Sequence, residues 1–482
     1  MRMQWPMIAG LTLTMSVPAQ AQQPSSLTAA ADAMGARALN SIQYTGSGLM
    51  YGFGQAFEPG GRWPRFIQSS YTATINYQTP SMRLMQVRMQ GEAPPRGGAT
   101  QPIAGEQRAI NVVSGKYTWQ EGGAQANPVP EATADRLLQL WATPHGVIKS
   151  AMANSGRVDG STLSFTIEGR AVKAVLNAQN LVEKVSYLSS NEVVGDYPID
   201  IAYSDYADFG GVKFPRHIVQ TEDGHPTLDI TISDVKPNAP ASEIVPANVQ
   251  IAGTTTAVPK IGVDKLADGV WYLTTPNQRS WAVEFKDYAV VVEGIGSEAR
   301  NLALMEEVGK LIPDKPIRYV INTHAHYDHA GGLRTYVAKG ITVVTHEANK
   351  PFYEQAWARP HTVVPDLLSK SPRPATFETV GDKKVLTDGT RSIELYFMKG
   401  TSHHVANLLV FMPKEGLLYW GDGYNPPQGN DPRDPGRTPE QMIDIYRIIT
   451  TNNLNVKTIA PAHGFGPKPY DDLKKAIGLI PL

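Results

Sequence analysis

The chain has 482 residues, 41% of them hydrophobic, and a formal net charge of −1. A chain of this length exceeds one ordinary domain and can bury sizeable cores. The near-zero charge gives no reason to expect nucleic acid or an anionic membrane as a partner. The sequence contains no cysteine, which excludes disulfides, thiolate ligands and cysteine nucleophiles. A metal would therefore have to be held by nitrogen and oxygen atoms.

The first residues, 1–21, have the pattern of an export signal. Arg2 precedes an apolar run from Met7 to Val17, and Ala19-Gln20-Ala21 fits a small-x-small cleavage site. The apolar run is too short to span a bilayer, and no later stretch reaches transmembrane length. We therefore expect a periplasmic or secreted protein with no transmembrane segment after removal of residues 1–21.

Residues 22–240 are expected to form a mostly antiparallel β domain. A short helix is predicted from Leu27 to Leu39. Apolar and polar residues then alternate, as in strands, in the stretches "SYTATINYQ", "STLSFTIEG", "LVEKVSYLSS", "YPIDIAYSDY" and "PTLDITISDV". Residues 134–154 are the one long helical candidate, broken at Pro144, and the Gly- and Pro-rich residues 92–107 are predicted to be a loop. Such a domain could shape a pocket, form oligomers or bind the cell envelope.

The pattern changes after residue 240. Residues 241–260 are rich in Pro, Ala and Thr without strong periodicity, which is typical of a linker. In residues 261–482, strand-like runs such as "WAVEF" and "YAVVVEG" alternate with helical stretches such as "SEARNLALMEEVGKLI". This alternation predicts a second domain built from strands and helices, and hence an α+β chain overall.

A cluster of histidines marks this second domain. The stretch "NTHAHYDHAGG" places three of the eleven histidines and one aspartate within six positions. His324 and His326 are two apart in a turn after a strand-like run, so both imidazoles can point to one side. Asp328 and His329 are adjacent and must diverge, which suits a second metal beside the first. A solvated polar turn would not need imidazoles, so the pattern favours a metal site.

Further donors follow other strand-like runs. "ELYFMKGTSHH" offers His403 and His404, "GLLYWGD" ends in Asp422, and "VKTIAPAH" ends in His463. If these strands run in register, their ends meet at one rim of a sheet, where α/β folds place their sites.

With these residues the chain resembles the metallo-β-lactamase superfamily, over roughly Gly269 to Gly464. The segments "HAHYDH", "GTSHHVAN", "GD" and "AHG" match that superfamily's ligand segments in order. The resemblance implies an αβ/βα sandwich with two zinc ions per chain. It assigns His324, His326 and His403 to a first zinc site. It assigns Asp328, His329 and His463 to a second site, with Asp422 bridging the two. His403 is preferred to His404 because Gly400 and Asn407 then fit the family's register.

Five imidazoles and two carboxylates suit Zn²⁺. Two zinc ions a few ångströms apart would share a bridging water and bring its pKa to about 7, giving a hydroxide nucleophile. Asp328 could orient that hydroxide and carry its proton to the leaving group. Tyr424, two residues after Asp422, is a candidate oxyanion donor, and a tyrosine packed on the sheet edge is the alternative.

An aspartate at position 422 resembles the glyoxalase II, lactonase, phosphodiesterase and sulfatase branches, whereas the β-lactamase branches carry cysteine or serine near there. The sequence therefore predicts an exported dizinc hydrolase acting on a small-molecule ester, lactone, thioester or related bond. A β-lactamase, or a phosphodiester or sulfate ester hydrolase, is the alternative on the same site. An alternative of another class is an envelope binding module in which the zinc domain is secondary.

Overall fold

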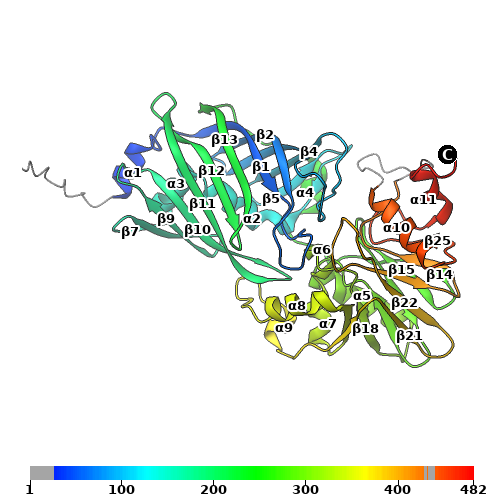
Figure 1. Cartoon of the computed structure of the whole chain (residues 1–482). Helices are drawn as coiled ribbons and strands as arrows, with labels where there is room; N and C mark the ends of the chain where they lie inside the picture. The colour runs from blue at the N-terminus through cyan, green and yellow to red at the C-terminus, as the bar shows by residue number, and fades with distance from the viewer. Residues whose placement is uncertain (1–25, 428–430, 432–439, 482) are drawn as a thin grey trace, which may run out of the picture.

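A curved antiparallel sheet and a two-sheet sandwich follow one another along the chain (Figure 1). The computed structural model describes residues 26–427, 431 and 440–481. The predicted export signal, residues 1–21, lies outside the described residues. Within the described residues, no helix is long and apolar enough to cross a membrane.

The N-terminal sheet has thirteen strands. They are β1 (Ser41–Tyr51), β2 (Arg65–Asn76), β3 (Ser81–Gln90), β4 (Gln107–Ser114), β5 (Tyr117–Glu121), β6 (Asn127–Pro128), β7 (Arg157–Asp159), β8 (Thr162–Ile167), β9 (Arg170–Leu176), β10 (Val182–Asn191), β11 (Gly195–Asp208), β12 (Lys213–Glu222) and β13 (His225–Pro237). Strands consecutive in the chain pair antiparallel, except β6 and β7, and β1 pairs with β13, with Tyr44 opposite Val235. The edges of the sheet are therefore β6 and β7. The period-2 pattern explains the pleat: Tyr197, Ile199 and Ile201 of β11 are buried, and the residues between them are not.

Three helices pack on one face of this sheet: α1 (Leu27–Ala33), α2 (Thr133–Trp141) and α3 (Pro144–Ala153). The predicted break at Pro144 is confirmed, because this proline is the first residue of α3, where a missing N–H costs nothing. The first helix is shorter than predicted and ends at Ala33, since Gly35 adopts a φ of 66°, which is incompatible with helix.

The predicted linker is partly folded. Its residues 247–252 form α4 (Ala247–Ala252), whose Val249 is buried against Val112 and Trp119 of the N-terminal sheet. The Asn248 side chain also donates to the carbonyl of Ala126 at 2.6 Å. The first half of the segment therefore follows the surface of the sheet, and the C-terminal part begins at β14.

The C-terminal part is a sandwich of two mixed sheets. The seven-stranded sheet contains β14 (Gly262–Ala267), β15 (Val270–Thr274), β16 (Arg279–Glu284), β17 (Ala289–Val292), β18 (Ile317–Ile321), β19 (Thr342–His346) and β20 (Phe377–Val380). The six-stranded sheet contains β21 (Lys383–Thr387), β22 (Ser392–Phe397), β23 (Leu408–Met412), β24 (Leu417–Tyr419), β25 (Thr458–Ile459) and β26 (Lys468–Pro469). Strands β17 to β20 are parallel and the strands before them antiparallel. A core that includes Trp281, Val283, Leu395 and Val410 fills the space between the sheets.

Helices cover the outer faces of both sheets. They are α5 (Glu298–Leu311), α6 (Tyr327–Ala330), α7 (Leu333–Ala338), α8 (Lys350–Trp357), α9 (Leu367–Lys370), α10 (Glu440–Thr451) and α11 (Tyr470–Ala476); short 3-10 turns span Pro130–Ala132 and Glu347–Asn349. Residues of α5, α7 and α8 pack on the seven-stranded sheet, and residues of α10 and α11 pack on the other. This arrangement confirms the expected αβ/βα sandwich, and the antiparallel sheet before it confirms the expected N-terminal fold.

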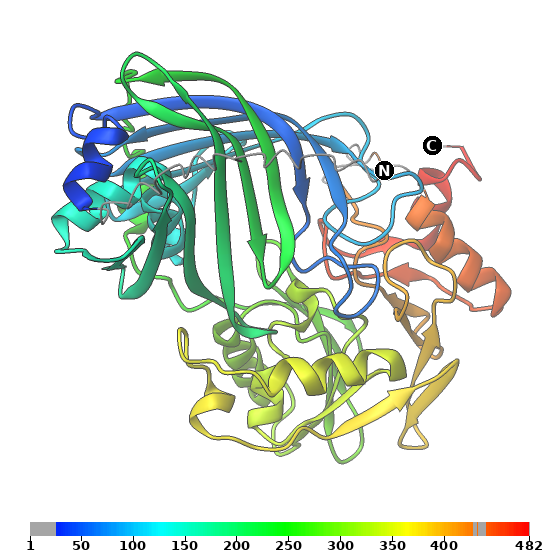
Figure 2. The same ribbon diagram turned by 60° about the vertical axis from the view of Figure 1, so that its left-hand side comes forward.

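The two parts pack directly on each other (Figure 2). One core cluster runs from the N-terminal sheet, with Ile201, into α8 of the sandwich, with Tyr353. At the contact, the ring of Phe53 meets the ring of Tyr327 edge-on, with 5.4 Å between centroids. This junction lies next to the histidine cluster, because Tyr327 stands between the predicted ligands.

Candidate metal centre

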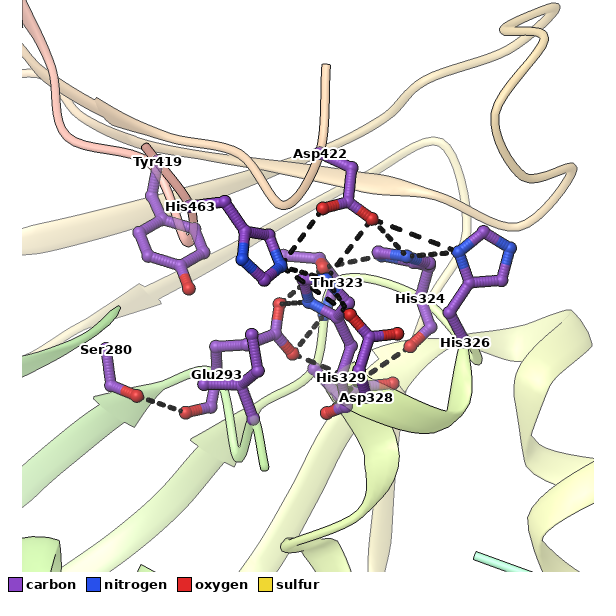
Figure 3. A network of polar contacts seen from close by, with 12 residues as sticks. Ser280, Glu293, Thr323, His324, His326, Asp328, His329, Tyr419, Asp422 and His463 are labelled. Carbon is purple, nitrogen blue, oxygen red and sulfur yellow. Dashed lines mark hydrogen bonds and ion pairs between the residues drawn. The ribbon is translucent and has the colours of Figure 1, made fainter. Parts of the chain in front are cut away.

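Four chain segments meet at one rim of the sandwich. Strands β22 and β24 both run antiparallel to β23, and β25 runs parallel to β24, so these three end on the same side. Strand β18 of the other sheet ends opposite them. The segments carry the seven predicted ligands (Figure 3 labels all but His403): His324, His326, Asp328, His329, His403, Asp422 and His463. The structure brings all seven together.

The seven side chains form two groups of four that share Asp422. In each group the donor atoms lie within 4.8 Å of one another. The first group is His324, His326, His403 and Asp422, and the second is Asp328, His329, His463 and Asp422. The grouping has the same members as the two sites that the sequence predicts; their roles as ligands stay predictions.

Distances in the first group fit a tetrahedral metal. His324 Nε2 lies 2.9 Å from His326 Nδ1 and 3.2 Å from His403 Nε2. Asp422 Oδ2 lies 2.9 Å from His403 Nε2. A tetrahedral zinc with Zn–N bonds of about 2.0–2.1 Å separates its ligand atoms by roughly 3.3 Å, so the donors already stand near those separations.

The second group has the same spacing. His463 Nε2 lies 3.2 Å from His329 Nε2 and 3.1 Å from Asp422 Oδ1. Asp328 Oδ2 lies 3.4 Å from His329 Nε2 and 3.5 Å from His463 Nε2. Asp422 Oδ2 is also 3.3 Å from His329 Nε2. This oxygen is therefore close to an imidazole of each group, which is the position of a bridging atom.

Two imidazoles of the centre bond to backbone carbonyls, and these bonds show which ring nitrogen carries the proton. His326 Nε2 lies 2.9 Å from the carbonyl oxygen of Ala56, and His463 Nδ1 lies 2.8 Å from that of Asn277. A carbonyl can only accept, so these imidazoles carry their protons on the outer nitrogen and present a lone pair inward. Converging lone pairs repel one another, and a cation is the partner that such a donor set fits.

Glu293 is a residue of the centre that sequence reasoning missed. It directly follows β17, is fully buried and has a φ of 74°, a backbone conformation that non-glycine residues rarely adopt. Its Oε2 accepts from the Thr323 hydroxyl at 2.5 Å, and that hydroxyl accepts from His324 Nδ1 at 2.9 Å. The same Oε2 lies 3.2 Å from His329 Nδ1. Glu293 thus orients one imidazole of each group from below (Figure 3).

A sequence signal for Glu293 did exist. It is a carboxylate at the end of the apolar run "YAVVVEG", the same context in which Asp422 ends "GLLYWGD". A buried charge at the end of a core strand needs a partner, so this position could have been singled out in the same way.

Burial and charged neighbours shift the pKa values of two imidazoles of the centre in opposite directions. Burial and the neighbouring imidazoles of His329 and His326 lower the pKa of His324 well below its ordinary value. Burial would also lower the pKa of His329, but the carboxylates of Asp422, Asp328 and Glu293 outweigh it and raise that pKa well above its usual range. The centre therefore attracts positive charge.

Three neighbouring residues have other environments. His404 lies outside both groups, and its Nδ1 accepts from the backbone of Ala406 at 3.1 Å, so the geometry favours His403 over His404. Asn407 is fully buried, and its carbonyl accepts from the Met398 N–H at 2.9 Å, which steadies the loop before it. Tyr424 is buried in the core beneath α10. Its oxyanion role stays a prediction, and its position favours the packing alternative.

A pocket of about 440 Å³ opens beside the cluster. Its lining residues are Gln55, Ala99, Thr100, Pro276, Asn277, Arg279, Asp328, His403, Asp422, Asn425, His463, Gly464 and Phe465. Pockets of this volume hold small molecules. The first three lining residues come from the N-terminal part, so the two parts of the chain share the pocket.

Comparison with known proteins agrees with the geometry. A sequence profile of the metallo-beta-lactamase superfamily matches residues 273–463. The 2,4-dinitroanisole O-demethylase subunit alpha of Nocardioides sp. (strain JS1661) is 23% identical over 164 residues, which are 34% of this chain and 46% of that protein. The chain thus matches less than half the length of this curated relative.

Two similar solved structures are metallo-beta-lactamases of low sequence identity to this chain. A metallo-beta-lactamase from Pontibacter korlensis is 19% identical and covers 46% of this chain and 98% of its own, with a TM-score of 0.36. The metallo-beta-lactamase FIM-1 from Pseudomonas aeruginosa is 17% identical and covers 45% of this chain and 94% of its own, with a TM-score of 0.35. The part of the chain that carries the histidine cluster, residues 273–463, belongs to the metallo-β-lactamase superfamily.

Proposed function

We propose that this chain is an exported dizinc hydrolase that cleaves a small ester, lactone, thioester or related bond. The observation that carries the proposal is the pair of four-donor groups that share Asp422. Their imidazoles include two that hold their protons outward against carbonyl oxygens and turn their lone pairs inward. Five imidazoles and two carboxylates in this arrangement suit zinc better than magnesium or calcium, which prefer oxygen donors.

The side chains divide the work of hydrolysis. When bound, two zinc ions supply a hydroxide at neutral pH and polarise the scissile bond. Asp328 faces the pocket, and its Oδ1 accepts from the Gln55 side chain at 2.8 Å, so its carboxylate is held in one orientation. From there it can take the proton of the nucleophile and deliver it to the leaving group. Glu293 and Thr323 keep the imidazole of His324 in one tautomer.

The size of the pocket supports a small substrate. At about 440 Å³, with apolar walls from Pro276 and Phe465 beside the polar cluster, it suits a compact molecule with one hydrolysable group. A β-lactam, phosphodiester or sulfate ester remains the alternative on the same donors. A pure envelope binding module is less well supported, because three residues of the N-terminal part, Gln55, Ala99 and Thr100, line the pocket beside the donor groups.

The test is metal content and turnover on one sample of full-length protein. We expect about two zinc ions per chain and chelator-sensitive hydrolysis of p-nitrophenyl acetate or a lactone. The panel should add thioester, phosphodiester, sulfate and β-lactam substrates, and 2,4-dinitroanisole, which the name of the Nocardioides relative suggests. Full zinc occupancy without turnover on any of them would contradict the proposal.

Export needs its own experiment. Expression of the full chain in a Gram-negative host, followed by fractionation and N-terminal sequencing, is expected to give a periplasmic or secreted form that begins after Ala21. A form that stays in the cytoplasm with residues 1–21 attached would contradict it.

A further inference from the structure

A loop of the N-terminal sheet reaches into the metal centre. Residues 52–64 join β1 to β2, and their backbone bonds to the two histidine-bearing segments of the sandwich. The carbonyl of Gly54 accepts from Tyr327 N at 3.1 Å, and the carbonyl of Phe57 accepts from Val405 N at 2.8 Å. The loop is thus fixed between the turn that carries His326 and Asp328 and the turn that carries His403.

A second N-terminal loop supports the first. Residues 91–106 join β3 to β4, and Gly97 N donates to the carbonyl of Ser402 at 2.9 Å. The carbonyl of Gln101 accepts from the buried Gln441 side chain at 2.6 Å. Both loops therefore bond to the turn that carries His403, the first loop at Val405 and the second at Ser402.

Gln55 lies where these loops meet the cluster. Its Oε1 accepts from the backbone N–H of Ala99 at 2.8 Å. Because a backbone N–H can only donate, this bond identifies the oxygen of the amide and turns Nε2 the other way. Nε2 then donates to Asp328 Oδ1 at 2.8 Å, while Asp328 Oδ2 faces His329 and His463. The amide holds one carboxylate oxygen and leaves the other to the second donor group.

The neighbouring residue acts on the first donor group. The carbonyl of Ala56 accepts from His326 Nε2, which makes His326 Nδ1 the lone-pair donor. Two consecutive residues of the N-terminal sheet thus orient one side chain of each group.

The two N-terminal loops approach the sandwich too closely for a side chain at Gly98 or Gly54. A Cβ at Gly98 would lie 2.0 Å from Gln55 Oε1 and 2.7 Å from the His326 ring, and one at Gly54 would lie 2.4 Å from the Tyr327 ring. Contacts this short cannot exist without displacement, so the interface requires glycine there. Loose docking of two independent modules would not require such packing.

We propose that the N-terminal sheet is a structural part of the metal centre. Gln55 is a positioning residue for Asp328, Ala56 fixes the tautomer of His326, and Gln55 with Ala99 and Thr100 forms one wall of the substrate pocket. The inference rests on the proposed function for its kinetic consequences, but its effects on metal binding do not depend on which substrate is cleaved.

The test uses Gln55→Leu and Gln55→Glu in the full chain. Leucine keeps most of the volume without a donor, and glutamate keeps the shape but presents an acceptor to Asp328. We expect both variants to lose about 10- to 100-fold in kcat and in the affinity of the second zinc site, the usual cost of removing an outer partner of a metal ligand. The visible d–d spectrum of the cobalt-substituted protein is expected to change with them.

The matched control is Gln43→Leu. It removes another glutamine side chain of the N-terminal sheet, whose Nε2 donates to Thr74 Oγ1 at 3.0 Å. It is expected to leave kcat, zinc affinity and the cobalt spectrum unchanged. Wild-type values of all three in both Gln55 variants would overturn the proposal. So would a normal Gln55→Glu beside an impaired Gln55→Leu, because the hydrogen bond donated to Asp328 would then be unnecessary and the shape of the side chain or its bond to Ala99 would explain the effect.

Failure of the proposed function would look different. The wild-type protein would then bind zinc without turning over any substrate, while the zinc titration and the cobalt spectrum would still report whether Gln55 orients Asp328. A far-UV circular dichroism spectrum and a thermal melt confirm that each variant is folded before these measurements are made.

Discussion

The two parts of the molecule contribute different kinds of group to one centre. The sandwich supplies all seven side chains of the two donor groups, every one of them ionisable. The N-terminal sheet supplies uncharged groups: the carbonyl of Ala56 and the carboxamide of Gln55, itself held by the N–H of Ala99. The sandwich thus determines which chemistry is available, and the sheet determines how two donors are oriented and how much space a substrate has.

The largest effect is expected from the sandwich. Asp422→Asn should lower occupancy of the second metal and activity together, by about a thousandfold, because losing a bridging carboxylate removes several kcal/mol of stabilisation. Zinc content and kcat/KM on the same sample measure this. Asp314→Asn is the control, since Asp314 has a φ of 64° that asparagine tolerates. Unchanged zinc stoichiometry and rate would rule out the bridging assignment.

We expect the two parts of the chain to unfold in one transition, and an ion pair within the sandwich can test this. Asp366 pairs with Arg334 inside the sandwich, where Arg334 Nε lies 2.5 Å from Asp366 Oδ2 and is only 4% exposed. Burial would raise the pKa of Asp366, but Arg334 and the N–H of Ser369 outweigh it and lower the pKa to about 2. Asp366→Asn should cost about 3 kcal/mol at pH 7, because it leaves a buried guanidinium without its partner.

The stabilisation that Asp366 contributes decreases as the pH falls. A carboxyl whose pKa is lowered in the folded state stabilises the fold above its ordinary pKa near 3.8, and this contribution is lost as the pH falls toward about 2. The difference between wild type and Asp366→Asn in urea unfolding should therefore shrink from pH 4 downward. One core cluster joins the two parts, so we expect a single transition to move. Two transitions of which only one moves would show that the parts are independent.

The third prediction concerns the interface at the metal centre. Gly98→Ala should lower kcat by about tenfold, since the added methyl must displace Gln55 or the His326 ring, and such outer contacts are usually worth at least that much. Gly123→Ala is the control, because the nearest atom to a Cβ there is 3.7 Å away. Equal rates for both variants would mean that the loop of residues 91–106 adapts without moving the donors.

The division between the two parts also explains what sequence could reveal. The strands were predictable because burial on alternate faces leaves a period of two, as in β11. The alternation of helices with strands after residue 261 predicted a domain built from both, and the sandwich itself was implied by the family resemblance of the ligand segments. The His324 and His403 segments were predictable because metal binding needs particular side chains. Glu293 was missed although its position at the end of an apolar strand resembles that of Asp422.

The contribution of the N-terminal sheet could not be predicted in the same way. A carbonyl is present at every residue, so nothing in the sequence marks that of Ala56 as a partner of His326. Gln55 stands in "YGFGQAFEPGG", where neither a carboxylate pair nor a histidine draws attention to it. The pairing of β1 with β13, the close packing at Gly54 and Gly98 and backbone hydrogen bonds to the sandwich bring this loop to the cluster.

The smallest effect is expected at the far end of the interface. Arg359 of the sandwich makes a bidentate pair with Asp223 of the sheet, at 2.7 and 2.8 Å, and their side chains are 29% and 23% exposed. Asp223→Asn should lower stability by less than about 1 kcal/mol, because partly solvated pairs contribute little. Arg359 also keeps its bond to the carbonyl of Asp196 at 2.9 Å. Asparagine tolerates the φ of 51° at this position.

Kinetic measurements distinguish the Arg359–Asp223 ion pair from the contact between Gln55 and Asp328. Asp223→Asn should leave kcat, KM and zinc affinity at wild-type values, and its small shift in the urea midpoint should vanish in high salt, where the ion pair is screened. A tenfold loss of kcat would mean that the orientation of the whole sheet, and not the two residues at its loop, sets the donors. Unchanged kinetics beside an impaired Gln55→Leu would confine the catalytic contribution of the sheet to the loop that contacts His326 and Asp328.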